Sequence, residues 1–451
     1  MNKKTLTKRE TFAIGLMLFA LFFGAGNMIF PPALGQEAGT NMWSATLGFL
    51  ITGVGLPLMG VIAISKTNGD FTEISKRVNP IFGILFTIVL YLAIGPLFGI
   101  PRTGTVAFEI GLTPFLRSDM NSTGVPLALY TVVFFGVTLW LALNPTKIVD
   151  RIGKVLTPLL LGVLALLVIK SFITPMGSFQ APEQKYTSSP FTQGFIDGYL
   201  TMDTIAALVF GIVIITAIKE KGIKSETTIA SICVKAGIIA AVGLVLVYLS
   251  LAYIGASSVE AIGLKENGGS ILTSVATYLF GSFGTLILAL AITFACLTTS
   301  IGLTTACGRF FTTIFPSLSY KTIVVVLTIF SAIIANVGLT QLIQISVPIL
   351  VFIYPIAIIL IVLSFIDRKG SLYQEVYVST VIAGSIVSLM DALKGAGMPI
   401  RAIDSLFEAY LPLYSQGIGW IVPTIIAAII GYVIGKVRHT ANSDNHSKKA
   451  S

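Results

Sequence analysis

Apolar runs long enough to cross a membrane follow one another along almost the whole chain of 451 residues. A run of about 18 or more apolar residues is typical of a membrane-spanning helix. Backbone polar groups find no water inside a bilayer, so such a run must fold as a helix that satisfies its own hydrogen bonds. Only 11% of the residues are charged, whereas soluble domains have about 25%. The sequence therefore predicts an all-α integral membrane protein without a separate soluble domain.

The apolar runs divide into about twelve expected membrane spans. They are residues 11–33, 43–65, 81–108, 125–144, 150–173, 191–218, 228–256, 281–307, 320–339, 341–366, 375–393 and 417–436. Most of the 29 lysines and arginines fall in connections on one side of this arrangement, which the positive-inside rule makes the cytoplasmic side. An even number of spans then places both termini in the cytoplasm. The net charge of +9 reflects these connections, and no nucleic-acid binding is expected.

The first span carries residues that interrupt a helix. Gly24, Gly26 and Asn27 lie in mid-membrane, and a pair of prolines follows. Glycine disfavours a helix by about 1 kcal/mol and proline by about 3 kcal/mol. An unwound stretch inside a membrane is tolerated where its backbone groups line a cavity or bind a ligand. The alternative is a tight helix crossing that uses small residues.

A second interruption is expected in the sixth span. Gly194 and Gly198 stand beside two acids, Asp197 and Asp203, ahead of an apolar stretch. An acid inside a membrane is costly and is a functional candidate, although Asp197 could instead lie at the outer interface or in a loop. If the first ten spans form two five-helix halves, the first and sixth spans occupy corresponding places. Paired interruptions of this kind indicate the binding site of a carrier.

Two further groups of polar residues lie inside expected spans. Thr298 and Thr299 in the eighth span offer hydroxyl oxygens, which a hard cation such as sodium prefers. Alternatively, these hydroxyls bond back to carbonyls of their own helix. Arg102 lies about 22 residues into the third span, which places it near the outer edge of a straight helix. It could snorkel to the headgroups or pair with an acid as part of an outer gate.

Four motifs, in the expected order, resemble the bacterial branched-chain amino acid:cation symporter family. They are Gly24-Ala25-Gly26-Asn27 with Ile29-Phe30-Pro31-Pro32, Ile100-Pro101-Arg102-Thr103, the stretch from Asn144-Pro145-Thr146 to Gly153-Lys154, and Gly198-Tyr199-Leu200-Thr201-Met202-Asp203. The likeness runs from about residue 10 to residue 436 and so covers nearly the whole chain. This family imports leucine, isoleucine and valine with sodium or protons across the bacterial cytoplasmic (inner) membrane.

The resemblance implies the leucine-transporter fold, which has two inverted five-helix repeats plus two extra helices, with helices 1 and 6 broken. On that basis the chain divides into five parts. They are a cytoplasmic N-terminus at 1–10, a first repeat at 11–173, a second repeat at 174–366, two additional transmembrane helices at 367–436, and a cytoplasmic tail at 437–451.

The same resemblance implies two sodium sites. An asparagine in the broken first helix of that fold contacts one sodium ion, and it corresponds to Asn27. The second sodium site uses carbonyls before the break and an Ala-x-x-hydroxyl-hydroxyl pattern in helix 8. These positions correspond to Ala20, Phe23, Ala295, Thr298 and Thr299. The outer-gate arginine of that fold follows its first break, where this chain has Phe30, so Arg102 is only a candidate substitute.

The substrate is expected at mid-membrane between the broken helices. Its carboxylate is assigned to backbone amides of Gly24, Ala25, Gly26 and Asn27, its ammonium to carbonyls and hydroxyls of Tyr199, Leu200 and Thr201, and its branched side chain to Phe98, Phe195 and Met202. Asp203 is a candidate proton site. Pocket size can exclude aromatic substrates, but one methylene is worth only about 1–3 kcal/mol, so leucine, isoleucine and valine should compete.

Two alternative functions remain. The first is a carrier for other small neutral amino acids, and the second, less favoured, is a passive channel. An enzyme is not expected, because both histidines lie in the C-terminal tail and no His-Glu-x-x-His signature is present. No cofactor is expected beyond the coupling ion, sodium or a proton. The expected partners are the amino acid and the lipid bilayer. The sequence leaves open which ion is used, and whether the protein is a monomer or a weak oligomer.

Overall fold

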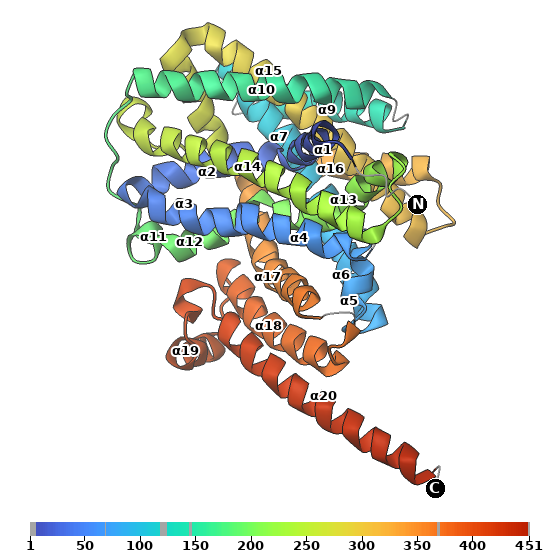
Figure 1. The fold of residues 1–451 in the computed structure, drawn as a ribbon. Helices are drawn as coiled ribbons and strands as arrows, with labels where there is room; N and C mark the ends of the chain where they lie inside the picture. Colours follow the sequence, from blue (N-terminus) through green and yellow to red (C-terminus); the bar gives the residue numbers. More distant parts are fainter. Residues whose placement is uncertain (1–5, 68, 118–123, 144–146, 368–369, 450–451) are drawn as a thin grey trace.

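The computed structural model describes residues 6–67, 69–117, 124–143, 147–367 and 370–449, and all regular structure in these ranges is helical (Figure 1). The helices of the first part of the chain are α1 (Lys8–Phe22), α2 (Ala25–Ala38), α3 (Met42–Leu50), the π-helix η2 (Ile51–Gly55), α4 (Leu56–Ser65), α5 (Phe71–Ser75), α6 (Pro80–Leu92), the π-helix η3 (Ala93–Leu97), α7 (Gly99–Gly111), α9 (Val125–Leu143) and α10 (Lys147–Ile173). The later ones are α11 (Gln184–Thr187), α12 (Pro190–Asp197), the short 3₁₀-helix η5 (Gly198–Thr201), α13 (Asp203–Glu220), α14 (Glu226–Ile262), α15 (Gly268–Ile314), α16 (Tyr320–Ala335), α17 (Leu339–Ile366), α18 (Gln374–Gly395), α19 (Arg401–Tyr410) and α20 (Ile421–Lys449).

These helices confirm the expected all-α membrane architecture. Each of the twelve expected spans overlaps at least one helix. Within the described ranges, nine helical segments are long and apolar enough to cross a membrane, and two shorter apolar helices span residues 158–173 and 320–335. Large apolar side chains such as Trp140 and Ile429 stay exposed, as expected for surfaces that face lipid. The number of crossings, the inverted repeat and the five-part division of the chain stay predictions.

The last helices lie to one side of the main bundle (Figure 1). α17 packs against α18, and α18 packs against α20. The final span was expected at 417–436, with a polar tail at 437–451. Instead, α20 begins at Ile421 and runs on through Lys449, so helix continues into the segment that was expected to be a tail.

Two helix pairs near the centre approach each other through glycine. α2 packs against α14, where a Cβ on Gly35 would lie 2.0 Å from the carbonyl oxygen of Ala252. α12 packs against α3, where a Cβ on Gly194 would lie 1.8 Å from the carbonyl oxygen of Ala45. Helices in membranes associate through close packing, which small residues permit. These two crossings hold α2 and α12 in place, and each of these helices borders one of the interruptions described below.

Gly35→Ala is expected to destabilise the fold by about 2 kcal/mol or more, because the added methyl group overlaps backbone that cannot rotate away. The measurement is the apparent melting temperature and the monodisperse fraction of the purified variant in detergent. The control is Gly162→Ala, because Gly162 is exposed on α10 and a Cβ there meets nothing within 4 Å. Equal melting temperatures for the two variants would contradict the predicted tight crossing.

Candidate functional site

The first helix break lies between α1 and α2 and is two residues long. Phe23 and Gly24 leave the helical conformation, and α2 begins at Ala25. The Asn27 side chain caps the new helix, because its Oδ1 accepts the Gly24 N–H at 3.0 Å. Side chains three residues into a helix commonly bond back in this way. The two prolines lie inside α2, so the interruption is narrower than the sequence suggests.

The second break separates α12 from α13. The short helix η5 ends at Met202, whose φ of 64° lies in the left-handed region. A large side chain is rarely held in that region, and such backbone strain is typical of functional sites. Met202 is buried, and the Asp203 N–H beside it donates to Thr201 Oγ1 at 3.3 Å. The expected breaks in helices 1 and 6 are therefore confirmed.

A buried hydrogen-bonded cluster joins the two breaks. Asn27 Nδ2 donates to Asp203 Oδ2 at 2.7 Å, and the Tyr248 hydroxyl of α14 donates to the same oxygen at 2.5 Å. Asn27 Nδ2 also contacts the Tyr248 hydroxyl. All three side chains are at most 2% exposed. A buried carboxylate needs such donors, because burial without hydrogen bonds costs several kcal/mol. Asp203 thus ties α2, α13 and α14 together.

Arg102 reaches the same region from α7. Its side chain is 2% exposed. Nη1 donates to the Leu200 carbonyl at 2.6 Å, and Nη2 donates to the Ser346 hydroxyl of α17 at 3.3 Å. The guanidinium carbon lies 5.0 Å from the centre of the Phe30 ring, within the range of a cation–π interaction. Arg102 therefore links its own helix, α7, to α2, η5 and α17.

The expectation that Arg102 snorkels to the headgroups is wrong. Gly95 has a non-helical backbone, with φ −89° and ψ −119°, so the third span is kinked between α6 and α7. A count of residues along one straight helix therefore misplaces the arginine. Its Nη1 lies 3.4 Å from where a Cβ on Gly26 would stand, and Thr201 O lies 3.1 Å from the same point. Gly26, Thr201 and Arg102 thus lie together where the two breaks meet.

The hydroxyls expected to bind sodium lie in α15. Thr298 and Thr299 both donate to the Ala295 carbonyl, at 2.8 and 3.0 Å, which is the arrangement expected if they bond back to their own helix. Each hydroxyl oxygen nevertheless keeps lone pairs that can accept a cation. A Cβ on Gly24 would lie 3.2 Å from the Thr299 methyl group and 3.6 Å from its hydroxyl. The structure therefore brings the first break against α15, directly after Phe23.

The side chains expected to enclose the substrate, Phe98, Phe195 and Met202, all belong to or pack against one buried apolar cluster. Tyr199 stacks on Tyr354 of α17 with ring centroids 4.4 Å apart, and Phe195 packs edge-on against Tyr199 at 5.6 Å. Phe98 is buried at the kink before α7, and no ring contact within the described ranges joins it to the other aromatic residues. Of the acceptors expected for the ammonium, the Leu200 carbonyl is bound by Arg102 and the Thr201 hydroxyl donates to the Gly198 carbonyl at 3.0 Å.

The other acid of the sixth span lies outside this site. Asp197 accepts hydrogen bonds from Tyr186, which precedes α12 in the chain, and from Gln193 at 3.0 Å. It therefore takes no part in the cluster around Asp203.

Sequence reasoning missed three polar side chains that hold the breaks. Tyr248 binds Asp203, Ser346 binds Arg102, and the Thr52 hydroxyl donates to the Phe195 carbonyl at 2.7 Å. Tyr248 and Ser346 lie in long, mostly apolar helices that contain other isolated polar residues, so the sequence alone gives only a weak signal for them. Thr52 lies in the π-helix η2, and such helical irregularities are often found at functional sites.

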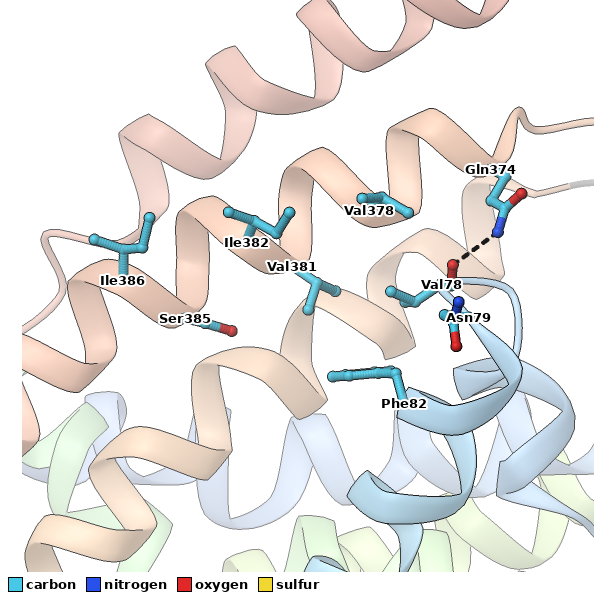
Figure 2. A pocket seen from close by; sticks show the side chains of 9 residues that line it. All are labelled: Val78, Asn79, Phe82, Gln374, Val378, Val381, Ile382, Ser385 and Ile386. Atoms are coloured by element: carbon cyan, nitrogen blue, oxygen red, sulfur yellow. Dashed lines mark hydrogen bonds between the residues drawn. The ribbon is translucent and has the colours of Figure 1, made fainter.

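A separate apolar groove of about 430 Å³ lies between the start of α6 and α18 (Figure 2). Val78, Phe82, Val381 and Ile382 contribute to its lining, and Gln374 Nε2 donates to the Val78 carbonyl at 2.9 Å at one end. None of the residues that hold the helix breaks lines this groove. It is therefore distinct from the candidate site.

Comparison with known proteins gives the family. Residues 7–438 match the family model described as branched-chain amino acid transport protein. The chain is 52% identical over 436 residues to the branched-chain amino acid permease BraB of Bacillus subtilis, a match covering 96% of this chain and 97% of the relative. It is 47% identical over 428 residues to the branched-chain amino acid transport system 2 carrier protein of Pseudomonas aeruginosa, with coverage of 95% and 96%.

Solved structures with little sequence similarity share the fold. Mhp1, a nucleobase-cation-symport-1 family transporter solved in a closed conformation with bromovinylhydantoin bound, gives a TM-score of 0.60 at 14% identity and covers 96% of this chain and 93% of its own. MhsT in complex with L-phenylalanine gives 0.57 at 15% identity, with coverage of 97% and 99%. Both have the leucine-transporter-like fold that was expected. The chain is a multi-pass membrane protein that belongs to the branched-chain amino acid transport protein family.

Proposed function

We propose that this protein is a secondary active transporter that imports leucine, isoleucine and valine together with a cation, by alternating access. The observation that carries the proposal is the meeting of two helix breaks in the protein interior, around Gly26, Thr201 and buried polar side chains. Half-helix ends at mid-membrane supply free amides and carbonyls for an amino acid and an ion. The setting is the bacterial cytoplasmic membrane, with both termini in the cytoplasm and the first ten helices arranged as inverted repeats.

The breaks offer complementary groups for the ends of an amino acid. The first amides of α2 have no partners in their own helix, and the helix dipole favours an anion there. The carbonyls of η5 on the opposite side suit an ammonium group. The relatives are named permeases and carriers for branched-chain amino acids, and buried apolar residues next to the breaks, such as Phe30 and Met202, would suit branched side chains. Because pocket contacts separate neighbouring aliphatic substrates only weakly, the three amino acids should compete.

Sodium is the favoured coupling ion, bound between the end of α1 and α15. The carbonyls of Ala20 and Phe23 and the oxygens of Ala295, Thr298 and Thr299 are its assigned ligands. Support comes from the contact between Gly24 and Thr299, which places the end of α1 beside these hydroxyls. A bound cation would stabilise the outward-open state and shift the population toward substrate binding. The rival is a proton carried by Asp203.

Thr298→Ala is expected to raise the half-saturating sodium concentration for leucine uptake about tenfold or more, because one oxygen ligand is lost. The measurement is uptake as a function of sodium concentration in proteoliposomes. Thr312→Ala is the matched control, because Thr312 lies in the same helix and donates to the carbonyl four residues back at 2.7 Å. An unchanged sodium dependence in Thr298→Ala would favour protons.

The proposed function is tested by labelled-leucine uptake into proteoliposomes of the purified protein under a sodium gradient or a proton gradient, never both. Concentrative uptake with sodium alone, inhibited by unlabelled isoleucine and valine, is the expected result. Uptake with protons alone would keep the substrate and change the ion. Inhibition by alanine or serine as strong as that by isoleucine would indicate a carrier for small neutral amino acids. Downhill flux without accumulation would indicate a channel.

A further inference from the structure

We infer that Arg102 binds the α-carboxylate of the substrate, an inference that rests on the proposed function. In this structure its Nη1 donates to the Leu200 carbonyl, one of the acceptors assigned above to the substrate ammonium. A carboxylate competes with that carbonyl for the guanidinium. When Arg102 turns to the carboxylate, the Leu200 carbonyl becomes free to accept from the ammonium group. One exchange of hydrogen-bond partners thus prepares the site for both ends of a zwitterion.

Arg102 carries a buried positive charge. Its side chain is 2% exposed, and no ion pair within the described ranges includes it. The carboxylate of Asp203 is close enough to attract Arg102 electrostatically, but its hydrogen bonds go to Asn27 and Tyr248. A buried charge without a direct ion pair is expensive, and the carbonyl, hydroxyl and aromatic contacts of Arg102 offset this cost only in part. A ligand that carries a carboxylate would neutralise it.

Arg102 also has a hydrogen-bond donor that is not used within the described ranges. A guanidinium has five N–H groups in a planar fork that matches a carboxylate. The hydrogen bonds of Arg102 go from Nη1 to Leu200 and from Nη2 to Ser346. Nε is fully buried and has no hydrogen-bond partner in the part of the chain that the structure describes. Unsatisfied buried donors are rare in native proteins, so this one points to a ligand.

The guanidinium of Arg102 also lies next to the first helix break. Nη1 lies 3.4 Å from where a Cβ on Gly26 would stand, so the guanidinium lies against the first turn of α2. The amides of this turn have no acceptors within their own helix. The Gly24 N–H is already bound by Asn27, which leaves the amides of the following residues. A carboxylate beside Gly26 can therefore accept from Arg102 and from the start of α2 together.

The inference is tested by equilibrium binding of L-leucine and of L-leucinamide, which lacks the carboxylate charge, to the purified full-length protein. For Arg102→Gln, we expect leucine affinity to fall about 10- to 100-fold, the usual effect of losing a charge-assisted hydrogen bond. Leucinamide affinity should change less than threefold, which is about the change expected from a substitution that removes no contact with the ligand. Arg102→Lys keeps the charge but loses the fork, so leucine binding should fall by less than in Arg102→Gln.

Ser346→Ala is the matched control, because it removes an acceptor of Arg102 and leaves the guanidinium in place. It should weaken both ligands equally, if at all. An equal loss of leucine and leucinamide in Arg102→Gln would show that Arg102 only links the helices, and it would overturn the inference. If Arg102→Gln does not fold, Arg102→Lys decides by the same comparison. Failure of the wild-type protein to bind leucine would instead contradict the proposed function.

Discussion

Gly26→Leu is expected to abolish leucine uptake while leaving membrane insertion intact. Gly26 lies where the two breaks meet, and a Cβ there already comes within 3.1 Å of Thr201 O, 3.4 Å of Thr201 Cα and 3.4 Å of Arg102 Nη1. The three further carbons of leucine would occupy the space assigned to the substrate carboxylate. They would also keep α2 and η5 from closing around it. The effect should therefore fall on transport, because the outer faces of the helices are unchanged.

The measurement is sodium-driven uptake in proteoliposomes that contain equal amounts of folded protein, as judged by size-exclusion chromatography. Gly136→Leu is the matched control and should transport normally, because Gly136 is exposed on α9 and a Cβ there meets nothing within 4 Å. Wild-type uptake by Gly26→Leu would rule out a substrate site between the breaks. Loss of uptake in both variants would show only that added bulk is poorly tolerated.

The helix breaks were predictable from sequence because their causes are local. Glycine, asparagine and paired acids disfavour a continuous helix wherever they occur in an apolar run. Even so, the length of each break depended on its neighbours. The Asn27 side chain restarts a helix at Ala25, and the strained conformation of Met202 is held by surroundings that no local pattern describes.

The partners across the site were not predictable, because they depend on how distant helices pack. Arg102 was placed at the membrane edge by counting along a straight helix, and the kink at Gly95 invalidates that count. Tyr248 is one of two tyrosines in a long apolar helix, and its contacts with Asp203 and Asn27 distinguish it. The residues most useful for mechanism were thus those whose role arises from tertiary structure.

Asp203→Asn is expected to abolish concentrative uptake if protons are the coupling ion, and to reduce it strongly at ordinary sodium concentrations if sodium is the coupling ion. The carboxylate accepts from Asn27 and from Tyr248, so it holds the first break against the second. It also begins α13 directly after Met202, where the second break ends. Loss of its charge removes a proton site if protons drive transport. If sodium drives it, the neutral amide weakens the contacts that position Asn27, and apparent sodium affinity should fall by about tenfold or more.

Two assays separate these mechanisms for Asp203→Asn. Accumulation is measured under an imposed gradient, and leucine exchange is measured with equal leucine and ions on both sides. If protons drive transport, the variant lacks its proton site but should still exchange leucine. If sodium drives transport, Asn27 is displaced in the variant, and leucine exchange should return only when the sodium concentration is raised. The control is Asp404→Asn, because Asp404 is also buried and is bound by the Tyr414 hydroxyl at 2.6 Å, but it lies in α19. Full accumulation by Asp203→Asn would remove Asp203 from coupling altogether and leave it as a structural link between α2, α13 and α14.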